Sequence, residues 1–340
     1  MTRSTPWRNR VLWFVLIALL VVPRVADPTA DPWPDLCWGS GIWTDEGFYT
    51  HAARDVVLFG GLADAFDNRV LSPILDAVHR FLFGVWGVGL TTARMPSIVA
   101  GLVSLPLFHA AMRRRFGPGV ARWGLLFFGL EASWLFTNRI GLIESTGVLV
   151  LVAAFYAWSV GSPLGWFVAG ALAAGAVAVK TTFLLFLPIP LLLVGWRGFR
   201  GERTVLREAA WYGAGAACAL GTYLVFWGLP HGPEIVRMNN FYRTRQSQPR
   251  SFTQLLWMVR RGLIGYHFGL LQRLETRTPV ATTLALCGLA LAWRPRQRAH
   301  RSRPRPRRDA EHLLILWFAA GLLFLLVSRY APARYFLVFH

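Results

Sequence analysis

The sequence predicts an all-α membrane protein that crosses the bilayer many times. Of its 340 residues, 54% are hydrophobic and only 16% are charged, whereas a soluble domain is about 25% charged. The hydrophobic residues recur in runs close to the ~20 residues that an α-helix needs to cross a bilayer. About nine to ten such runs fit into the chain. We therefore expect one polytopic membrane domain over residues 1–340.

The formal net charge of +19 does not indicate a nucleic-acid-binding protein. The basic residues lie mainly in loops between apolar runs, where they act as topology signals and contact lipid headgroups. Arginine clusters at 113–115, 197–207 and 294–308 mark the cytoplasmic side. They place the N-terminus inside and make 294–312 a basic cytoplasmic loop. The three cysteines have no disulfide or metal-site spacing.

The first apolar run, Val11 to Val22, has the length of a secretory signal peptide. Arg24 and the many later runs favour a retained first helix. The run at 165–196 is too long for one span and too short for two ordinary ones, so we predict two short helices that meet at Lys180. The other expected spans are 95–112, 123–136, 140–160, 208–229, 279–293 and 313–327.

Two long loops are expected outside the membrane, at residues 23–94 and 230–278. The first holds nine of the 17 acidic residues. Its segment 68–83 has amphipathic spacing, which favours a helix lying in the membrane interface over a core helix of a small soluble domain. The polar residues opposite its apolar face are Arg69, Ser72, Asp76, His79 and Arg80.

Asp45 and Glu46 stand at the start of a helix-compatible stretch in the first outer loop. Capping explains them by itself, because acidic residues in a first helical turn offset the macrodipole. Further charged residues are expected at the outer ends of spans, and each can belong to an interfacial ion pair, such as Arg139 with Glu144 or Glu131. Lys180 is the one lysine among 36 basic residues, and a compact ammonium suits a phosphate. The whole set is Glu131, Arg139, Glu144, Lys180 and, after the last complete span, Arg334.

Taken in order, these features resemble the GT-C membrane glycosyltransferases. The resemblance is greatest to bacterial relatives of the dolichyl-phosphate-mannose protein mannosyltransferases and to the lipid A aminoarabinose transferase. It covers most of the chain and is strongest from 43 to 190. It implies a GT-C-like bundle, and because such relatives continue through more helices, we expect a truncated or minimal member. The motifs are Asp45-Glu46 with Tyr49 and Ala52, 68–73 with FLFG at 81–84, Arg94, RRRFG at 113–117, Arg139-x-Gly-Leu-x-Glu144, Lys180 and Pro332-x-Arg334-Tyr335.

The resemblance implies transfer of a sugar from a polyprenyl-phosphate donor to an acceptor hydroxyl on the extracytoplasmic side. Asp45 would act as the base, with Glu46 beside it in the catalytic site. Lys180, Arg334 and Arg139 would bind the donor phosphate, while Glu144 and Tyr49 would orient acceptor or donor. The acceptor can be a protein, a lipid or a glycan.

Attack at an anomeric carbon needs a base and stabilisation of the departing phosphate, so our hypothesis is one-step inverting transfer. We expect no metal or other cofactor; a divalent metal stays open, with His231 and His267 in the second outer loop. The alternatives are a flippase for polyprenyl-linked sugars, although the chain has no clear internal repeat of the transporter kind, and a non-catalytic membrane scaffold.

Overall fold

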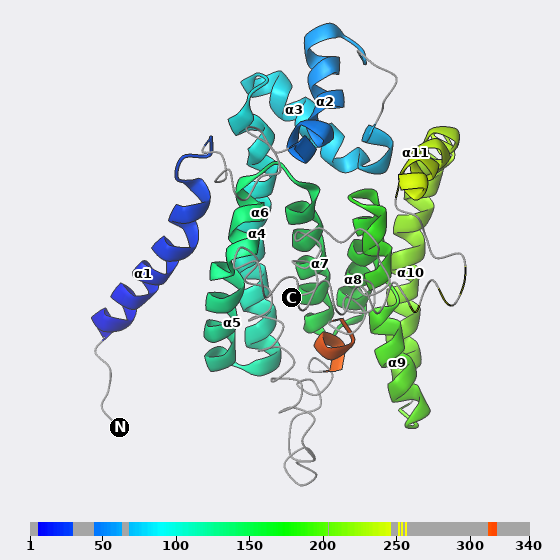
Figure 1. Ribbon diagram of the computed structural model, residues 1–340. Helices are drawn as coiled ribbons and strands as arrows, with labels where there is room; N and C mark the ends of the chain where they lie inside the picture. The colour runs from blue at the N-terminus through cyan, green and yellow to red at the C-terminus, as the bar shows by residue number, and fades with distance from the viewer. Residues whose placement is uncertain are drawn as a thin grey trace. The chain divides into compact units, whose positions relative to one another are not determined.

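The computed structural model describes residues 6–29, 44–62, 68–202, 204–245 and 312–317, together with positions 251, 253 and 256. Within these residues every regular element is a helix (Figure 1). The chain divides into two compact units. The first comprises Met1–Ala63 and Leu75–Leu149, and the second comprises Asp64–Ile74 and Val150–His340. Each unit is described by itself.

Four helical stretches among the described residues are long and apolar enough to cross a membrane. They are Leu90–Phe116, Ile143–Val160, Thr181–Phe199 and Val205–Gly228. Two shorter apolar stretches, Trp13–Val25 and Pro163–Ala178, accompany them. Large apolar side chains on these helices are exposed, among them Phe14, Leu192 and Phe226, as expected where lipid replaces water. The predicted class, an all-α membrane protein, is confirmed.

The first unit is built from α1 (Pro6–Val25), α2 (Thr44–Phe59), α4 (Leu90–Phe116), α5 (Pro118–Leu130) and α6 (Ala132–Arg139), with most of α3 (Pro73–Trp86) and the start of α7 (Ile143–Val160). α4 and α5 lie side by side in Figure 1, and α1 packs against both. The core between these three helices consists of Leu20, Leu105 and Leu125.

Arg24 fixes the end of α1 to this unit. Its side chain is fully buried. Its Nε donates to Asn138 Oδ1 at 2.8 Å, Nη2 to Gly129 O at 2.8 Å and Nη1 to Leu20 O at 2.6 Å. Because each bond satisfies a donor that water cannot reach, α1 is an integral part of the unit. This bonding favours the retained first helix over a cleaved signal peptide.

The segment after α4 differs from the expected single span at 123–136. It is divided at Glu131, whose carboxylate accepts the backbone N–H of Trp134 at 2.5 Å and so begins α6. Residues 137–139, which separate the expected spans 123–136 and 140–160, form the last turn of α6, and the chain turns instead between Ile140 and Leu142. Glu131 is therefore a helix cap and not the interfacial partner of Arg139.

The amphipathic segment 68–83 is two elements, the 3₁₀ turn η2 (Asn68–Leu71) and α3. Along α3 the residues Ile74, Val78 and Phe81 are exposed, whereas Asp76 and His79 are buried. Leu75 and Phe83 are buried as well, so an apolar stripe along Ile74, Val78 and Phe81 faces away from the protein while the packed face is mixed polar and apolar. An outward apolar stripe suits a helix lying in the membrane interface.

The second unit contains α8 (Pro163–Gly175), η3 (Ala176–Ala178), η4 (Thr181–Phe186), α9 (Ile189–Phe199), α10 (Val205–Tyr223), the π-helical turn η5 (Leu224–Gly228) and α11 (Gly232–Arg245). The predicted break at Lys180 is confirmed, because this residue has extended backbone (φ −159°, ψ 129°) between η3 and η4. α8 and α10 cross so closely that a Cβ at Gly170 would collide with the Tyr212 carbonyl.

Candidate active site

A buried ion pair between Glu46 and Arg94 joins α2 to α4 in the first unit. Arg94 Nε donates to Glu46 Oε1 at 2.6 Å, and Arg94 Nη2 donates to Glu46 Oε2 at 2.9 Å. The exposed fraction is 0% for the Arg94 side chain and 2% for the Glu46 side chain. This bidentate fork is the strongest hydrogen-bonded arrangement that an arginine and a carboxylate can form. It fixes the start of α2, which carries the Asp45-Glu46 motif.

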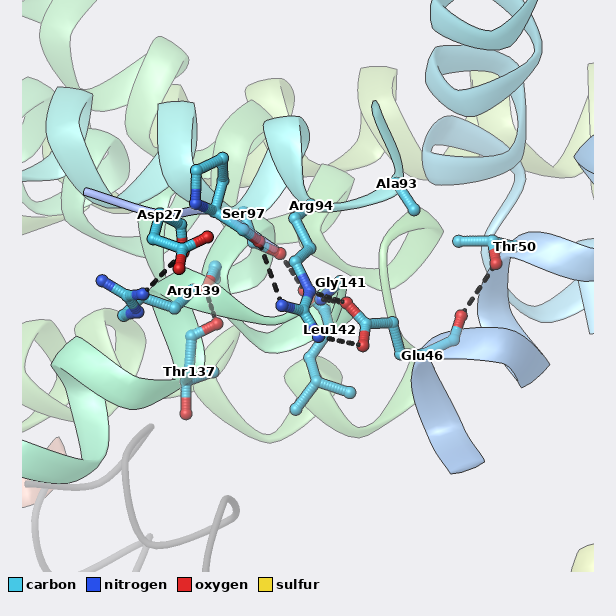
Figure 2. Close-up of polar contacts among 12 residues, drawn as sticks. Asp27, Glu46, Thr50, Ala93, Arg94, Ser97, Thr137, Arg139, Gly141 and Leu142 are labelled. Atoms are coloured by element: carbon cyan, nitrogen blue, oxygen red, sulfur yellow. Dashed lines mark hydrogen bonds and ion pairs between the residues drawn. The ribbon is translucent and has the colours of Figure 1, made fainter. Parts of the chain in front are cut away.

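Two backbone groups complete the pair. The N–H of Gly141 donates to Glu46 Oε1 at 2.7 Å, and Arg94 Nη1 donates to Pro28 O at 3.0 Å. Figure 2 shows Gly141 and Leu142 beside the fork. The pair therefore holds together four segments of the chain, those around residues 28, 46, 94 and 141.

Glycine at position 141 lets the backbone come unusually close to Glu46 and Ala93. A Cβ there would lie 3.0 Å from both Ala93 O and Glu46 Cγ, closer than such atoms normally approach. The close approach lets the backbone N–H of Gly141 reach the carboxylate. Next to it, Ser97 Oγ donates to Leu142 O at 2.9 Å and fixes the same turn to α4 (Figure 2).

The turn that carries Gly141 is also tied to the segment after α1. Arg139 donates from Nη1 to Pro23 O and from Nη2 to Asp27 O, the latter at 2.9 Å. Asn138 donates to Ser145 Oγ at 3.3 Å, and Ser145 donates to Thr137 O at 3.1 Å. Glu144 follows in the first turn of α7 and is buried. Arg139, Gly141 and Glu144 thus lie on a rigid turn beside the ion pair.

His79 of α3 supports the residue that precedes Arg94. Its Nε2 lies 3.0 Å from Ala93 O, so this nitrogen carries the proton and donates. Burial lowers the pKa of His79 below the ordinary histidine value, against the opposing effect of hydrogen bonds with the Ala93 and Leu75 backbone. The imidazole is therefore kept neutral.

The other predicted site residues divide into three groups. Asp45 belongs to α2, next to Glu46, but its side chain lies outside what the structure describes, while Tyr49 is half-buried with its ring 5.7 Å from that of Phe48. Lys180 is partly exposed and belongs to the second unit, so its convergence with Asp45 stays a prediction. Arg334 and His267 lie outside the described residues, and His231 stacks on Trp227 at 4.0 Å.

The sequence did not predict the partner of Glu46. In the sequence Arg94 is a motif residue before an expected span, yet a charged residue four positions into an apolar helix is costly unless it is paired. Arg24, which in the sequence only favours a retained first helix, is a buried anchor in the structure. Within the described residues, no group of three His, Cys, Asp or Glu side chains could hold a metal ion.

No protein-family model and no curated protein matches the chain. Two solved structures do: crystal structures of ArnT from Cupriavidus metallidurans, one bound to undecaprenyl phosphate and one in the apo state. Their TM-scores are 0.61 and 0.60, and the match covers 99% and 98% of this chain. The chain has the fold of ArnT.

The likeness to ArnT concerns the fold alone, since 18% of the residues are identical. This chain spans 58% of the ArnT chain. The GT-C resemblance drawn from the sequence is thereby confirmed at the level of architecture. The buried fork, the turn at 139–144 and the start of α2 are features of this chain on that scaffold.

Proposed function

We propose that the chain is the membrane-embedded part of a glycosyltransferase that uses a polyprenyl-phosphate-linked sugar as donor. Transfer goes to an acceptor hydroxyl on a protein, a lipid or a glycan at the extracytoplasmic face. The ArnT fold supports the reaction class, since one ArnT structure holds undecaprenyl phosphate. The observation that carries the proposal is the Glu46–Arg94 fork, which holds an acidic helix start beside the first residues of an apolar span.

In this proposal Glu46 positions α2 and Asp45 performs the chemistry. Glu46 accepts from Arg94 twice and from Gly141 once, so its oxygens are occupied by fixed donors. Asp45 is the neighbouring acid on the same helix, and we assign to it the role of the base.

The reaction is a displacement with inversion. Asp45 accepts the proton of the acceptor hydroxyl while the hydroxyl oxygen attacks the anomeric carbon. The bond between that carbon and the phosphate oxygen breaks, and polyprenyl phosphate leaves with the bonding electrons. A base in reach of the hydroxyl contributes about 10²–10⁴-fold to the rate.

Cationic side chains stabilise the departing phosphate. We assign this to Lys180 and Arg334, as compact or forked donors that suit phosphate oxygens. Arg139 is a weaker candidate, because its two terminal nitrogens already donate to Pro23 and Asp27. Glu144 and Tyr49 remain the candidates for orienting acceptor or donor.

The test compares two substitutions in the full chain. Purified protein is incubated with a synthetic polyprenyl-phosphate sugar and membrane extract as acceptor source. Asp45→Asn should lose transfer by about a hundredfold or more while its thermal unfolding stays like that of the wild type. Glu46→Gln should lose both activity and stability.

Two outcomes would overturn the proposal. Transfer by Asp45→Asn at close to the wild-type rate would exclude Asp45 as base. Sugar movement that requires a sealed bilayer, with no product formed in detergent, would indicate the flippase. Lys180→Ala should raise the donor concentration needed for half-maximal rate, and an unchanged saturation curve would remove Lys180 from the phosphate site.

A further inference from the structure

The end of the first unit opposite the candidate site is a cationic region with no acidic residue in its helices. Residues 1–26 and 77–130, which contain α1, α4 and α5, hold no Asp or Glu. Arg113, Arg114 and Arg115 end α4, and Arg122 lies in the second turn of α5. The charge of these helix ends is therefore positive throughout.

An aromatic ring lies at the centre of this region. The Trp13 ring of α1 meets the His109 ring of α4 edge to face, with centroids 5.9 Å apart. The guanidinium carbon of Arg122 lies 6.0 Å from the centroid of the same Trp13 ring. The cluster therefore consists of Trp13 from α1, His109 from α4 and Arg122 from α5, with the imidazole and the guanidinium beside the indole ring.

Two arginines of the region are available to a ligand. Arg113 and Arg122 are exposed, and both act electrostatically on His109. Within the part of the chain that the structure describes, neither forms a salt bridge with a carboxylate. Two guanidinium groups that act on the same imidazole and form no salt bridge within the described residues attract an anion, and their forked donors match phosphate oxygens.

The length of α4 places this region at the other membrane surface. Arg94 and Arg113 both lie in α4, and their separation in sequence corresponds to a rise of about 28 Å along the helix. The hydrocarbon core of a bilayer is about 30 Å thick. Trp7 and Trp123, each 65% exposed, flank the region as tryptophans do at membrane interfaces.

We propose that Arg113, Arg122, His109 and Trp13 form a binding site for the headgroup of an anionic phospholipid in the leaflet opposite the candidate active site. The phosphodiester would accept from the two guanidinium groups. The acyl chains would lie along exposed apolar residues that continue from the site, Phe14 and Ile17 on α1 and Phe127 on α5. These side chains favour a lipid over a free phosphate ion. The inference is independent of the proposed transfer reaction.

A second basic stretch shows that arginine alone does not make such a site. At the end of α9, Arg197 is occupied by Glu208 at 2.6 Å and by Glu202 at 2.9 Å. Arg207 in α10 is exposed but has these acids close in sequence. Arg207→Gln therefore makes the same charge change in a region without the Trp13 cluster, and it serves as the matched control.

The test is native mass spectrometry of the detergent-purified full chain, titrated with phosphatidylglycerol, phosphatidylcholine or inorganic phosphate. The wild type should bind one phosphatidylglycerol at least tenfold more tightly than phosphatidylcholine. Arg113→Gln/Arg122→Gln should weaken phosphatidylglycerol binding about thirtyfold, since each arginine near an anionic headgroup contributes on the order of 1 kcal/mol. Trp13→Leu should weaken it severalfold, and Arg207→Gln should leave it unchanged.

Three results would overturn the inference. The first is equal affinity of the wild type for both phospholipids, which needs no variant. The second is a loss in Arg207→Gln as large as that in the double variant, which would reduce the effect to general basicity. The third is displacement of the lipid by millimolar inorganic phosphate, which would make this a site for the free ion. Thermal unfolding of each variant in detergent micelles checks that the fold is retained.

Discussion

Replacing Glu46 by glutamine keeps the size of the side chain and removes its charge. In the wild type, the carboxylate accepts three hydrogen bonds, two from Arg94 and one from Gly141. A glutamine offers one oxygen and turns an NH₂ group toward a donor. The guanidinium of Arg94, with none of its side chain exposed, would then be a buried cation without its counter-charge.

The burial of the Glu46–Arg94 pair decides how far the free energy of unfolding should fall. A solvent-exposed ion pair contributes about 0–1 kcal/mol, whereas breaking a buried pair by removing one partner costs about 3–5 kcal/mol. With exposed fractions of 0% and 2%, the Glu46–Arg94 pair belongs to the second case. We therefore expect Glu46→Gln to lower the free energy of unfolding by about 3–5 kcal/mol.

The assay is unfolding by SDS in mixed detergent micelles, followed by far-UV circular dichroism, for Glu46→Gln, Arg94→Gln and the double variant. The double variant should lose less than the sum of the singles, with a coupling energy of about 1–3 kcal/mol. Glu234→Gln in the first turn of α11 is the control, where loss of an acid near a helix start costs about 1 kcal/mol or less. A loss below about 1 kcal/mol in Glu46→Gln, or strict additivity, would refute the reasoning.

Two further predictions concern other parts of the chain. Gly170→Ala should destabilise the protein by about 1–3 kcal/mol or more, because its Cβ would meet the Tyr212 carbonyl. The control is Gly213→Ala on α10, which should be neutral or stabilising because nothing lies within 4 Å of its Cβ. Equal shifts of the thermal unfolding temperature in the two variants would contradict the close crossing of α8 and α10. Burial holds the pKa of His79 below its ordinary value. The contribution of His79 to the free energy of unfolding should therefore be largest above about pH 6.5 and should decrease at lower pH, where the unfolded chain binds more protons than the folded one. His79→Gln should lose this slope in unfolding titrations between about pH 6.5 and 5, and an unchanged slope would assign it to other groups.

Hydropathy predicted the membrane class and the long spans, because α4 and α7 differ from loops over many residues at once. It did not predict the break at Glu131. Glutamate is not among the preferred N-cap residues, so its bond with the Trp134 N–H left no recognisable sequence signal. The loops expected at 230–278 and 294–312 fall largely outside the described residues, and the single-domain prediction stays a prediction.

The faces of α3 show a second limit of sequence reasoning. Periodicity separated an apolar side from a polar side, but it could not tell which one faces the protein. In water the apolar side would be buried, whereas at a membrane interface lipid can take that place. The structure buries Asp76 and His79 beside Leu75 and Phe83, and it leaves Ile74, Val78 and Phe81 exposed. The solvent, and not the spacing, decides this orientation.

The acidic motif in the sequence predicted the candidate site, but no feature of the sequence predicted the contacts that anchor Glu46. Glu46 bonds to residues 48 and 95 positions away in the chain, and no local pattern reports such distant pairings. The structure also suggests why two acids stand together. Consecutive helical residues leave the axis about 100° apart, so a helix that commits one carboxylate to a buried arginine can still offer the adjacent position to a substrate. If this division of roles holds, activity should depend on the charge at position 45 and on the hydrogen bonds at position 46. Glu46→Gln/Arg94→Gln, which replaces the ion pair by two neutral amides able to bond to each other, should then recover part of the transfer activity lost in Glu46→Gln, while no change at Arg94 should restore Asp45→Asn.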